Sequence, residues 1–200
     1  LAELLNFHSP IVVIDQRWPG LDFDYVGCDN RRGMHDLVAF LIGKGYRRLG
    51  VISFPETSSG AERRQGFLKA MFEHKLPVDA SLLTVADGSF RGAYDAARAL
   101  MERSDRPEVL VCFNDYLARE ALNAAWDLQL RVPEEVAVTG FGNLPLCELV
   151  RPRLTTVEQS PFNTGVAAAR LLLERISSTG NADRRDVIIP TRVIPRNSTR

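Results

Sequence analysis

Short runs of apolar, largely β-branched residues recur about every 30 residues from residue 49 onward, which is the length of one strand–helix unit. Polar or glycine residues bound each run, and amphipathic stretches fill the intervals. Because both faces of such strands are apolar, they suit a parallel sheet that helices cover on each side. The sequence therefore predicts a doubly wound α/β fold. The predicted strands are Ile11–Ile14, Leu49–Ile52, Leu82–Val85, Val109–Phe113 and Val136–Phe141.

The intervals between these strands carry the apolar spacing of amphipathic helices. In the first of them, Met34, Leu37 and Leu41 share one helical face, and Gly43 then ends the helix. We expect helices over residues 34–42, 61–75, 92–103, 115–130 and 162–176.

The strand–helix pattern is interrupted after Gly142. Residues 143–161 contain Pro145, Pro152 and Pro161 and one short β-like stretch, Leu154–Glu158. The last long helix follows, and after it come a polar loop, Ser177–Arg185, and an extended segment, Val187–Ile194. This interruption indicates a chain that leaves one lobe and later returns to it.

The charge balance argues against nucleic-acid binding by this chain itself. Lys+Arg and Asp+Glu both number 25, so the net charge is zero, whereas a DNA-binding domain is expected to present a basic face. No run approaches the roughly 18 apolar residues that a membrane helix needs. No signal peptide opens the chain, and because it begins at Leu1 rather than Met we expect a fragment or a processed product.

Three cysteines, Cys28, Cys112 and Cys147, are too widely spaced to form a CxxC motif. We expect buried, reduced thiols in a cytoplasmic protein, and a reactive thiol is the alternative. His8, His35 and His74 lack the spacing of metal ligands. The sequence also lacks a GxSxG elbow, a phosphate-binding loop and a GxGxxG motif. We therefore expect no enzyme activity, no cofactor and no metal site.

Polar and aromatic residues follow the predicted strands, and ligands of doubly wound sheets bind at the carboxyl ends of the strands. Carboxylates, amides and a guanidinium form paired hydrogen bonds with hydroxyls, and a ring can cover a ligand's C–H face. The sequence therefore predicts a polyhydroxylated ligand. The strand-end residues are Asp15, Gln16, Arg17, Trp18, Ser53, Phe54, Asp87, Phe90, Asn114, Asp115, Gly142 and Asn143.

Four of these residues also have a purely structural interpretation. Asp115 precedes a helix and is placed to cap it, a role worth roughly 1 kcal/mol. Asn114 is equally consistent with a turn, Trp18 with packing in a loop, and Phe90 with the core. Of the pair Arg63-Arg64 at the start of a helix, we expect one surface charge and one side chain directed at the ligand.

Eight segments, in order from residue 9 to residue 199, resemble the lactose-repressor (LacI/GalR) family. The segment Arg151–Gln159 resembles the family's "x-P-x-L-T-T-V-x-Q", which separates the regulators from most periplasmic sugar binders. The other seven are Pro10–Asp15, Val26–Gly33, Gly45–Ile52, Arg63–Phe67, Phe113–Leu122, Leu130–Asn143 and Pro195–Ser198.

The resemblance implies a two-lobed, periplasmic-binding-protein-like fold that binds a small effector between its lobes. By this likeness the carboxyl-side lobe comprises residues 30–147 and 185–200, and a partial amino-side lobe comprises residues 1–29 and 148–184. Family effector contacts correspond to Asp15, Asp29, Arg63, Asn114 and Phe90, and the strand-end rule adds Asn143 and Trp18.

Two positions depart from the family pattern. Gly142 stands where the family places an aspartate that contacts the ligand, so a bidentate carboxylate is missing. Gln129 stands where a glycine usually follows a helix, and a left-handed conformation there costs glutamine roughly 1 kcal/mol.

The resemblance also implies a transcriptional regulator, most simply a repressor. A helix-turn-helix head, absent from this chain, binds operator DNA, and the intact protein is a homodimer. The effector favours one lobe orientation and so changes the spacing of the two heads. Two alternatives remain: a solute-binding protein of a transporter, and an α/β enzyme that uses the Asp and Asn residues at the strand ends.

Overall fold

The computed structural model describes residues 9–18, 20–55, 57–177 and 183–200. The chain divides into two units, and the described residues of each have their own sheet. Unit 1 comprises Leu1–Asp29 and Ser160–Pro190, and unit 2 comprises Asn30–Gln159 and Thr191–Arg200.

Unit 2 is built on a parallel sheet in the order β4-β3-β5-β6. The strands are β3 (Leu49–Ser53), β4 (Leu83–Val85), β5 (Val109–Cys112) and β6 (Ala137–Thr139). A short 3-10 helix (Ala80–Leu82) leads into β4. The strand order reverses direction between β3 and β5, which makes the sheet doubly wound, as the sequence predicted. In such sheets the reversal opens a crevice at the carboxyl edge, where ligands bind.

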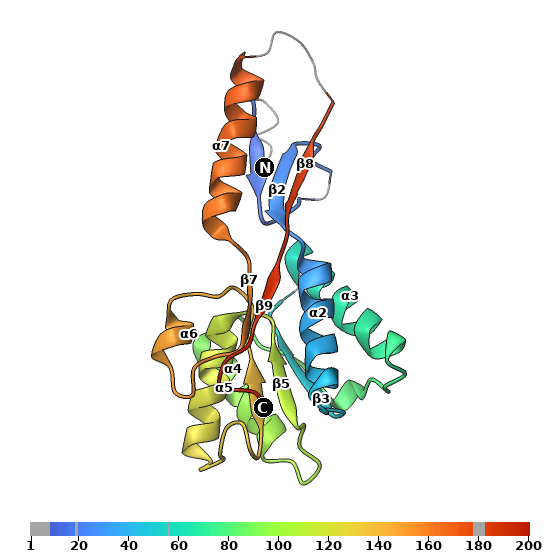
Figure 1. Cartoon of the computed structure of the whole chain (residues 1–200), viewed down its shortest axis with the longest axis vertical. Coiled ribbons are helices and arrows are strands. Elements are labelled where there is room, and N and C mark those ends of the chain that lie inside the picture. Colours follow the sequence, from blue (N-terminus) through green and yellow to red (C-terminus); the bar gives the residue numbers. More distant parts are fainter. Residues whose placement is uncertain (1–8, 19, 56, 178–182) are drawn as a thin grey trace. The chain divides into compact units, whose positions relative to one another are not determined.

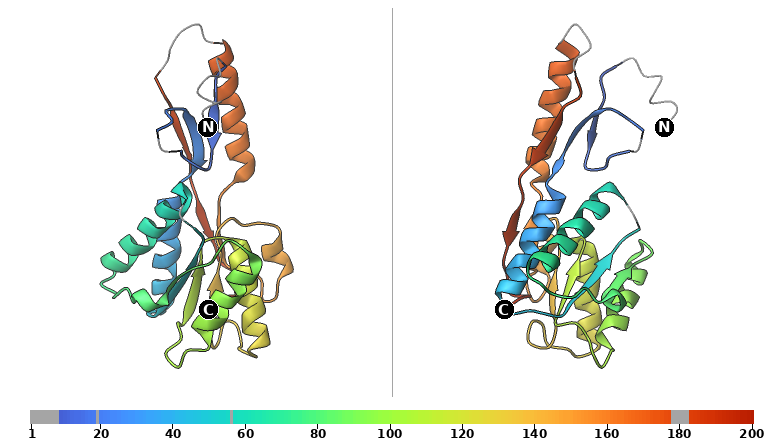
Figure 2. Two further views of the ribbon diagram at one scale, coloured as in Figure 1. Left: turned by 180° about the vertical axis from the view of Figure 1, so that it is seen from behind. Right: turned by 90° about the vertical axis from the view of Figure 1, so that its right-hand side faces the viewer.

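Four helices cover this sheet, with α2 and α3 on one face and α4 and α5 on the other (Figures 1 and 2). They are α2 (Asn30–Gly43), α3 (Ser58–Glu73), α4 (Phe90–Met101) and α5 (Asp115–Asp127). The predicted apolar face of α2 is confirmed, because Met34, Leu37 and Leu41 are fully buried. A four-residue helix, α6 (Leu146–Leu149), lies in the proline-rich segment and was not predicted.

An antiparallel pair completes unit 2 beyond β6. Strand β7 (Thr156–Glu158) pairs with β9 (Arg192–Ile194), with Val157 opposite Val193. The buried Ser198 hydroxyl donates to the Val138 carbonyl at 2.6 Å and accepts from the Thr155 amide at 2.8 Å. The last ten residues of the chain are thus built into unit 2.

Unit 1 contains a three-stranded parallel sheet in the order β1-β2-β8 and one long helix. These elements are β1 (Val12–Ile14), β2 (Asp24–Cys28), β8 (Asp186–Ile189) and α7 (Pro161–Ser177). The core of the unit joins Val26 of β2 to Ala168 and Leu171 of α7. Three other large apolar residues of this helix, Phe162, Leu173 and Ile176, are exposed.

A largely buried ion pair between Arg175 and Asp24 joins α7 to the sheet of unit 1. Arg175 donates from Nε and Nη2 to the two carboxylate oxygens of Asp24 at 2.6 and 2.8 Å. The side-chain hydrogen bond from Arg175 lowers the pKa of Asp24. This bidentate geometry is the strongest form of an arginine–carboxylate contact.

Strand pairing moves two of the predicted lobe boundaries. Residues 148–159 belong to unit 2 because β7 pairs with β9, and residues 185–190 belong to unit 1 because β8 pairs with β2. The single extended segment predicted for Val187–Ile194 is in fact two strands, β8 and β9, in different sheets. Pro190 lies between them and donates no backbone hydrogen bond.

Two further predictions concern single features of the chain. Gln129 follows α5 with φ of 57°, so the left-handed conformation expected at this family glycine position is retained. Among the described residues, no helix is both long and apolar enough to span a bilayer.

Candidate functional site

A pocket opens at the carboxyl edge of the unit 2 sheet, at the reversal between β3 and β5. Its volume is about 150 Å³. The Phe54 and Phe113 rings, which follow these two strands, meet edge to face with centroids 6.2 Å apart. The lining residues are Ser53, Phe54, Gly60, Ala61, Arg64, Val85 and Phe113.

The first turn of α3 forms one wall of this pocket. Thr57 caps the helix by accepting a hydrogen bond from the Gly60 amide at 3.1 Å. A Cβ atom at Gly60 would lie 3.1 Å from the Phe54 ring, so glycine permits the close approach of helix and ring. Local capping and a small residue thus hold the helix against the strand end.

The two arginines of α3 point in different directions, and it is Arg64, rather than the predicted Arg63, that lines the pocket. Arg64 is exposed and lines the pocket, whereas Arg63 is 4% exposed. Arg63 donates from Nε to Asn30 Oδ1 at 2.8 Å and from Nη1 to the Phe113 carbonyl. Its guanidinium also covers the Phe141 ring. Arg63 therefore joins α2 to the segments that follow β5 and β6.

Asn114, and not Asp115, caps α5. The Asn114 Oδ1 atom accepts from the Leu117 amide at 2.8 Å, and the residue has the extended backbone of an N-cap. Asp115 is fully buried instead, and it accepts from Thr156 Oγ1 at 2.6 Å and from the Leu144 amide at 2.8 Å. The alternative that Asp115 caps the helix is therefore wrong, because the cap is the preceding residue, Asn114.

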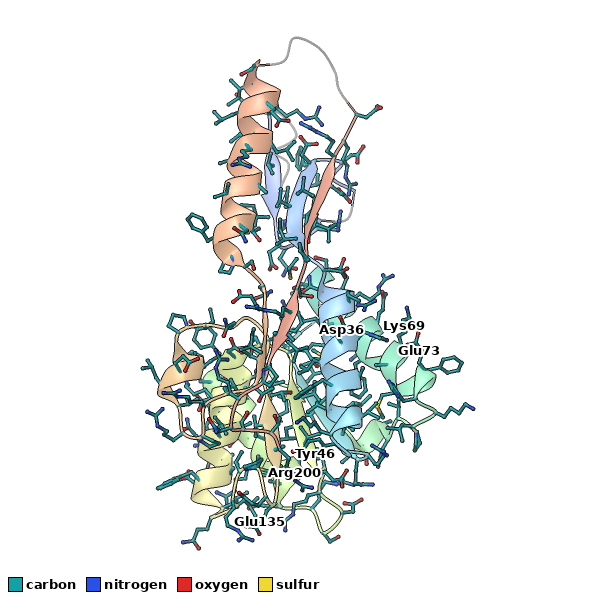
Figure 3. All side chains as sticks on the ribbon, in the orientation of Figure 1. Asp36, Tyr46, Lys69, Glu73, Glu135 and Arg200 are labelled. Carbon is teal, nitrogen blue, oxygen red and sulfur yellow. The ribbon has the colours of Figure 1, made fainter. Side chains whose placement is uncertain are left out.

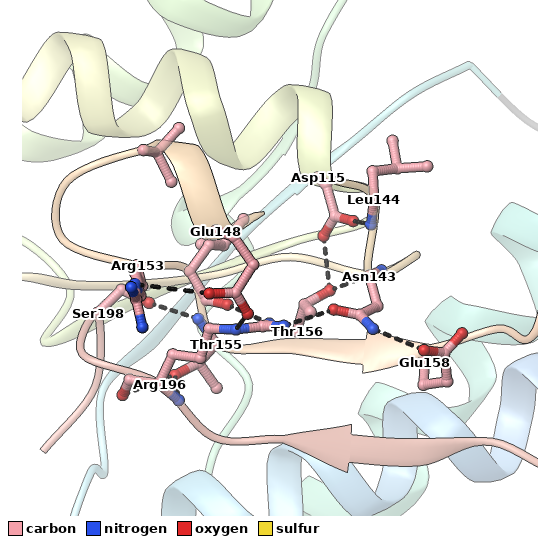
Figure 4. A network of polar contacts seen from close by, with 12 residues as sticks. Asp115, Asn143, Leu144, Glu148, Arg153, Thr155, Thr156, Glu158, Arg196 and Ser198 are labelled. Carbon is pink, nitrogen blue, oxygen red and sulfur yellow. Dashed lines mark hydrogen bonds and ion pairs between the residues drawn. The ribbon is translucent and has the colours of Figure 1, made fainter. Parts of the chain in front are cut away.

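Asn143 belongs to a polar network that connects the loop after β6 to β7 and the chain's last segment (Figure 4). Its side-chain amide donates to Glu158 Oε2 at 2.5 Å and accepts from Arg196 Nη2 at 2.8 Å. Gly142 beside it has φ of 140°, and a Cβ there would lie 2.9 Å from Asp115 Oδ2. The buried Asp115 carboxylate therefore occupies the space next to the position where the family places a ligand-contacting aspartate.

Phe90, the first residue of α4, lies in an exposed aromatic group rather than in the core. Its side chain is 56% exposed, and its ring centroid is 5.9 Å from that of Tyr116. The Arg119 guanidinium lies 4.6 Å from the Phe90 centroid. Burial in the core, one alternative for this residue, is therefore contradicted.

The remaining three predicted site residues belong to unit 1. Asp15 and Asp29 follow the carboxyl ends of β1 and β2, and Asp15 has a left-handed φ of 64°. The Asp15 carboxylate accepts from Gln16 Nε2 at 2.9 Å. Trp18 is 51% exposed, so it is not packed as the loop-filling alternative requires.

Two further predictions concern the cysteines and metal binding. All three cysteines are buried and unbridged, which confirms the expected buried thiols. Burial raises the pKa of the Cys147 thiol to about 12, so that thiol stays protonated and unreactive near neutrality. Within the described part of the chain, no cluster of His, Cys, Asp or Glu could hold a metal ion. His8 lies outside the described residues.

The sequence predicted some of the residues that line the pocket and missed others. Ser53 and Phe54 were expected at a strand end, and Phe113 was assigned to the strand itself. Arg64 and Val85 were not singled out as ligand contacts. The signal available was an aromatic residue within two positions of the end of β3, β5 and β6, namely Phe54, Phe113 and Phe141.

Comparison with known proteins agrees with this architecture. Residues 38–199 match the family model of the periplasmic binding protein-like domain. The chain is 34% identical, over 99% of its length, to the HTH-type transcriptional repressor PurR of Escherichia coli. It superposes with a TM-score of 0.89 and 27% identity on a LacI-family regulatory protein from Chloroflexus aggregans, covering 99% of this chain and 71% of the other. This chain is a periplasmic-binding-protein-like domain of the LacI family.

A second solved structure resembles this LacI-family domain, and the domain covers only part of the length of its relatives. A LacI-family regulator from Enterococcus faecium, solved with bound ribose, superposes with a TM-score of 0.84 and 26% identity over 95% of this chain and 70% of that one. The domain spans 59% of the length of the E. coli repressor that it matches. The relatives named here are repressors and regulators, in agreement with the prediction that the chain is not an enzyme.

Proposed function

We propose that this LacI-family domain is the ligand-sensing core of a cytoplasmic, DNA-binding transcriptional repressor. In this proposal it binds a sugar or sugar derivative between two lobes, which correspond to units 1 and 2. The observation that carries the proposal is that the polar candidate residues follow the carboxyl ends of strands in both sheets. Asp15 and Asp29 follow strands of one parallel sheet, and Arg63, Arg64 and Asn114 lie beside the carboxyl ends of strands in the other.

The proposed mechanism is a shift between two orientations of the lobes. An effector changes that equilibrium only by its difference in affinity for the two states. In an intact homodimer with helix-turn-helix heads, the half-sites are read at a fixed spacing, so a small rotation of the lobes alters operator affinity. The repressor relative and the ribose-bound neighbour support this proposal.

A ligand screen on the chain tests the sensing part of the proposal. We expect one class among sugars, sugar phosphates and purines to raise the melting temperature by mass action. Asp15→Asn removes a carboxylate yet tolerates the left-handed backbone, so it should abolish the rise without unfolding unit 1. Asp22→Asn is the matched control, because the Asp22 side chain is 84% exposed.

A second measurement separates a repressor from a transporter's solute-binding protein. The intact gene product should bind a DNA fragment from upstream of its own gene in fluorescence anisotropy, and the stabilising ligand should change that affinity. A product that binds the ligand but no DNA at low salt would overturn the proposal.

A further inference from the structure

The pocket at the carboxyl edge of unit 2 differs in its chemistry from a site for a bare sugar. Five of the described residues that line it have no polar group in their side chains: Phe54, Gly60, Ala61, Val85 and Phe113. Among these lining residues, only Ser53 and Arg64 offer a sugar ring polar side-chain partners. Each buried polar group without a hydrogen bond costs roughly 1–3 kcal/mol. The lining therefore favours a ring with few polar substituents.

The size of the pocket suits one six-membered ring. An apolar cavity of about 150 Å³ accommodates a benzene molecule, and this pocket has a volume of about 150 Å³. The edge-to-face pair of Phe54 and Phe113 provides two aromatic walls with the geometry that aromatic rings prefer. A planar ring can add to this pair, so the walls select for aromatic character as well as for size.

Two polar side chains in the pocket, Ser53 and Arg64, indicate which polar substituents a bound ring should have. Ser53 is 6% exposed, and its hydroxyl donates to the Thr84 carbonyl at 3.2 Å, so towards a ligand it can only accept. Arg64 is the one charged residue among the described lining residues. Its guanidinium makes no hydrogen bond or ion pair with any described side chain, unlike Arg63, Arg119 and Arg31.

An arginine that lines an apolar pocket without a carboxylate partner binds anions, and a carboxylate matches the fork of the guanidinium. We propose that this pocket binds an aromatic carboxylate, with the ring against Phe54 and Phe113 and the carboxylate on Arg64. The group is either a free aromatic acid or the carboxyphenyl part of a sugar derivative. This inference rests on the proposed function, because it names the chemical class that the sensing domain recognises on unit 2.

Isothermal titration calorimetry on the chain tests the assignment with defined probes. 4-Hydroxybenzoate represents the free acid, 4-carboxyphenyl glucoside the sugar derivative, benzyl alcohol a neutral ring, and glucose a bare sugar. We expect both carboxylates to bind at least about tenfold more tightly than benzyl alcohol, as a charge-assisted hydrogen bond requires. A glucoside that binds more tightly than the acid identifies the sugar derivative, and equal affinities identify the free acid.

Three variants locate the site. Arg64→Gln should weaken carboxylate binding about tenfold and leave benzyl alcohol binding unchanged. Arg91→Gln, whose side chain is 80% exposed, is the matched control and should bind like the parent. Ala61→Leu fills the pocket with a good helix former and should abolish binding of both rings. Its melting temperature verifies folding, and Arg64→Gln tests the site independently.

The outcomes separate this inference from the proposed function. Carboxylates that bind no better than benzyl alcohol, or an Arg64→Gln variant that behaves like Arg91→Gln, overturn the pocket assignment. If sugars still stabilise the chain in that case, the proposed function stands. If the carboxylate binds at Arg64 but no ligand changes operator binding by the intact protein, the proposed function fails and the pocket assignment stands.

Discussion

The Cζ atom of Arg63 lies 4.0 Å from the centroid of the Phe141 ring, so a helix of unit 2 contacts the end of the last strand of its main sheet. The same guanidinium bonds to Asn30 and to the Phe113 carbonyl. Arg63 therefore stabilises the carboxyl edge of the sheet, while the neighbouring Arg64 lines the pocket, where it can contact a ligand.

Replacing Arg63 tests this division of roles. Arg63→Ala leaves buried acceptors on Asn30 and Phe113 without their donor, and we expect a loss of about 3 kcal/mol in the free energy of unfolding. Arg64→Ala, at an exposed position, should change it by no more than about 0.5 kcal/mol. Urea denaturation measures both, and equal losses would contradict the assignment.

Asn114 has a capping role that can be separated from ligand binding. Asn114→Ala removes the acceptor for the Leu117 amide and should cost about 1 kcal/mol. Asn114→Ser keeps a capping oxygen, so its stability should approach that of the parent. If Asn114 also contacts the effector, the serine variant will lose the ligand-induced rise in melting temperature despite its normal stability.

The buried Asp115 carboxylate should be sensitive to a change of one atom. In Asp115→Asn, only one side-chain oxygen remains to serve both Thr156 and the Leu144 amide, and the new NH₂ group faces a donor. We expect a loss of about 2 kcal/mol. Asp95→Asn, at a surface position of α4, is the control for chemical denaturation. A loss no greater than the control's would mean that these hydrogen bonds do not stabilise unit 2.

His35 makes the stability of the α2–α3 pair depend on pH. It contacts Asp36 at 3.0 Å and Glu73 at 2.7 Å, and these two carboxylate residues are labelled in Figure 3. Hydrogen bonds to Asp36 and then to Glu73 raise the pKa of His35 above its usual 6.5. The hydrogen bond from His35 likewise lowers the pKa of Glu73 below its usual 4.5.

The direction of the pH effect follows from the sign of each shift. A raised histidine pKa stabilises the fold fully below pH 6.5, and that stabilisation disappears as the pH rises through the raised value. A lowered Glu73 pKa stabilises above pH 4.5. The urea midpoint should therefore fall between pH 6 and pH 8.5 in the parent, by more than in His35→Gln. His74→Gln, at an exposed residue, should retain the parent's slope.

Gln129 offers a stabilising substitution. Its φ of 57° places a side chain in a conformation that glycine adopts freely, so Gln129→Gly should stabilise by up to about 1 kcal/mol. Leu128→Gly, one residue earlier with φ of −83°, should destabilise instead. Thermal unfolding of the two variants should thus shift in opposite directions.

The main sheet and its helices were predictable because each buried element carries its own pattern. The runs at 49–52 and 109–113 are apolar on both faces, and they form β3 and β5 of the central sheet. Strand β2 was missed because Asp24 and Gly27 interrupt its apolar pattern. The buried Asp24 carboxylate is satisfied by Arg175 and by the Arg185 amide, 151 and 161 residues away, which no local window contains.

The candidate site was predictable only as an edge of the sheet. The strand-end rule places Ser53, Phe54 and Asn114 together, but it does not decide which polar group faces a ligand. Asn114 and Asp115 are adjacent polar residues, and the sequence does not show at which of them α5 begins. Whether Arg63 or Arg64 is buried depends on which side of α3 packs against α2. Tertiary packing determines both.

Strand β8 completes the sheet of unit 1, and the segment from β9 to Ser198 completes unit 2. A nascent chain that ends before Asp186 therefore lacks the closing strand of both units. Although domains commonly fold one after another as they leave the ribosome, this arrangement delays both units until the segment after α7 has been synthesised. A stop codon anywhere from Asp186 to Ser198 would remove residues on which unit 2 depends.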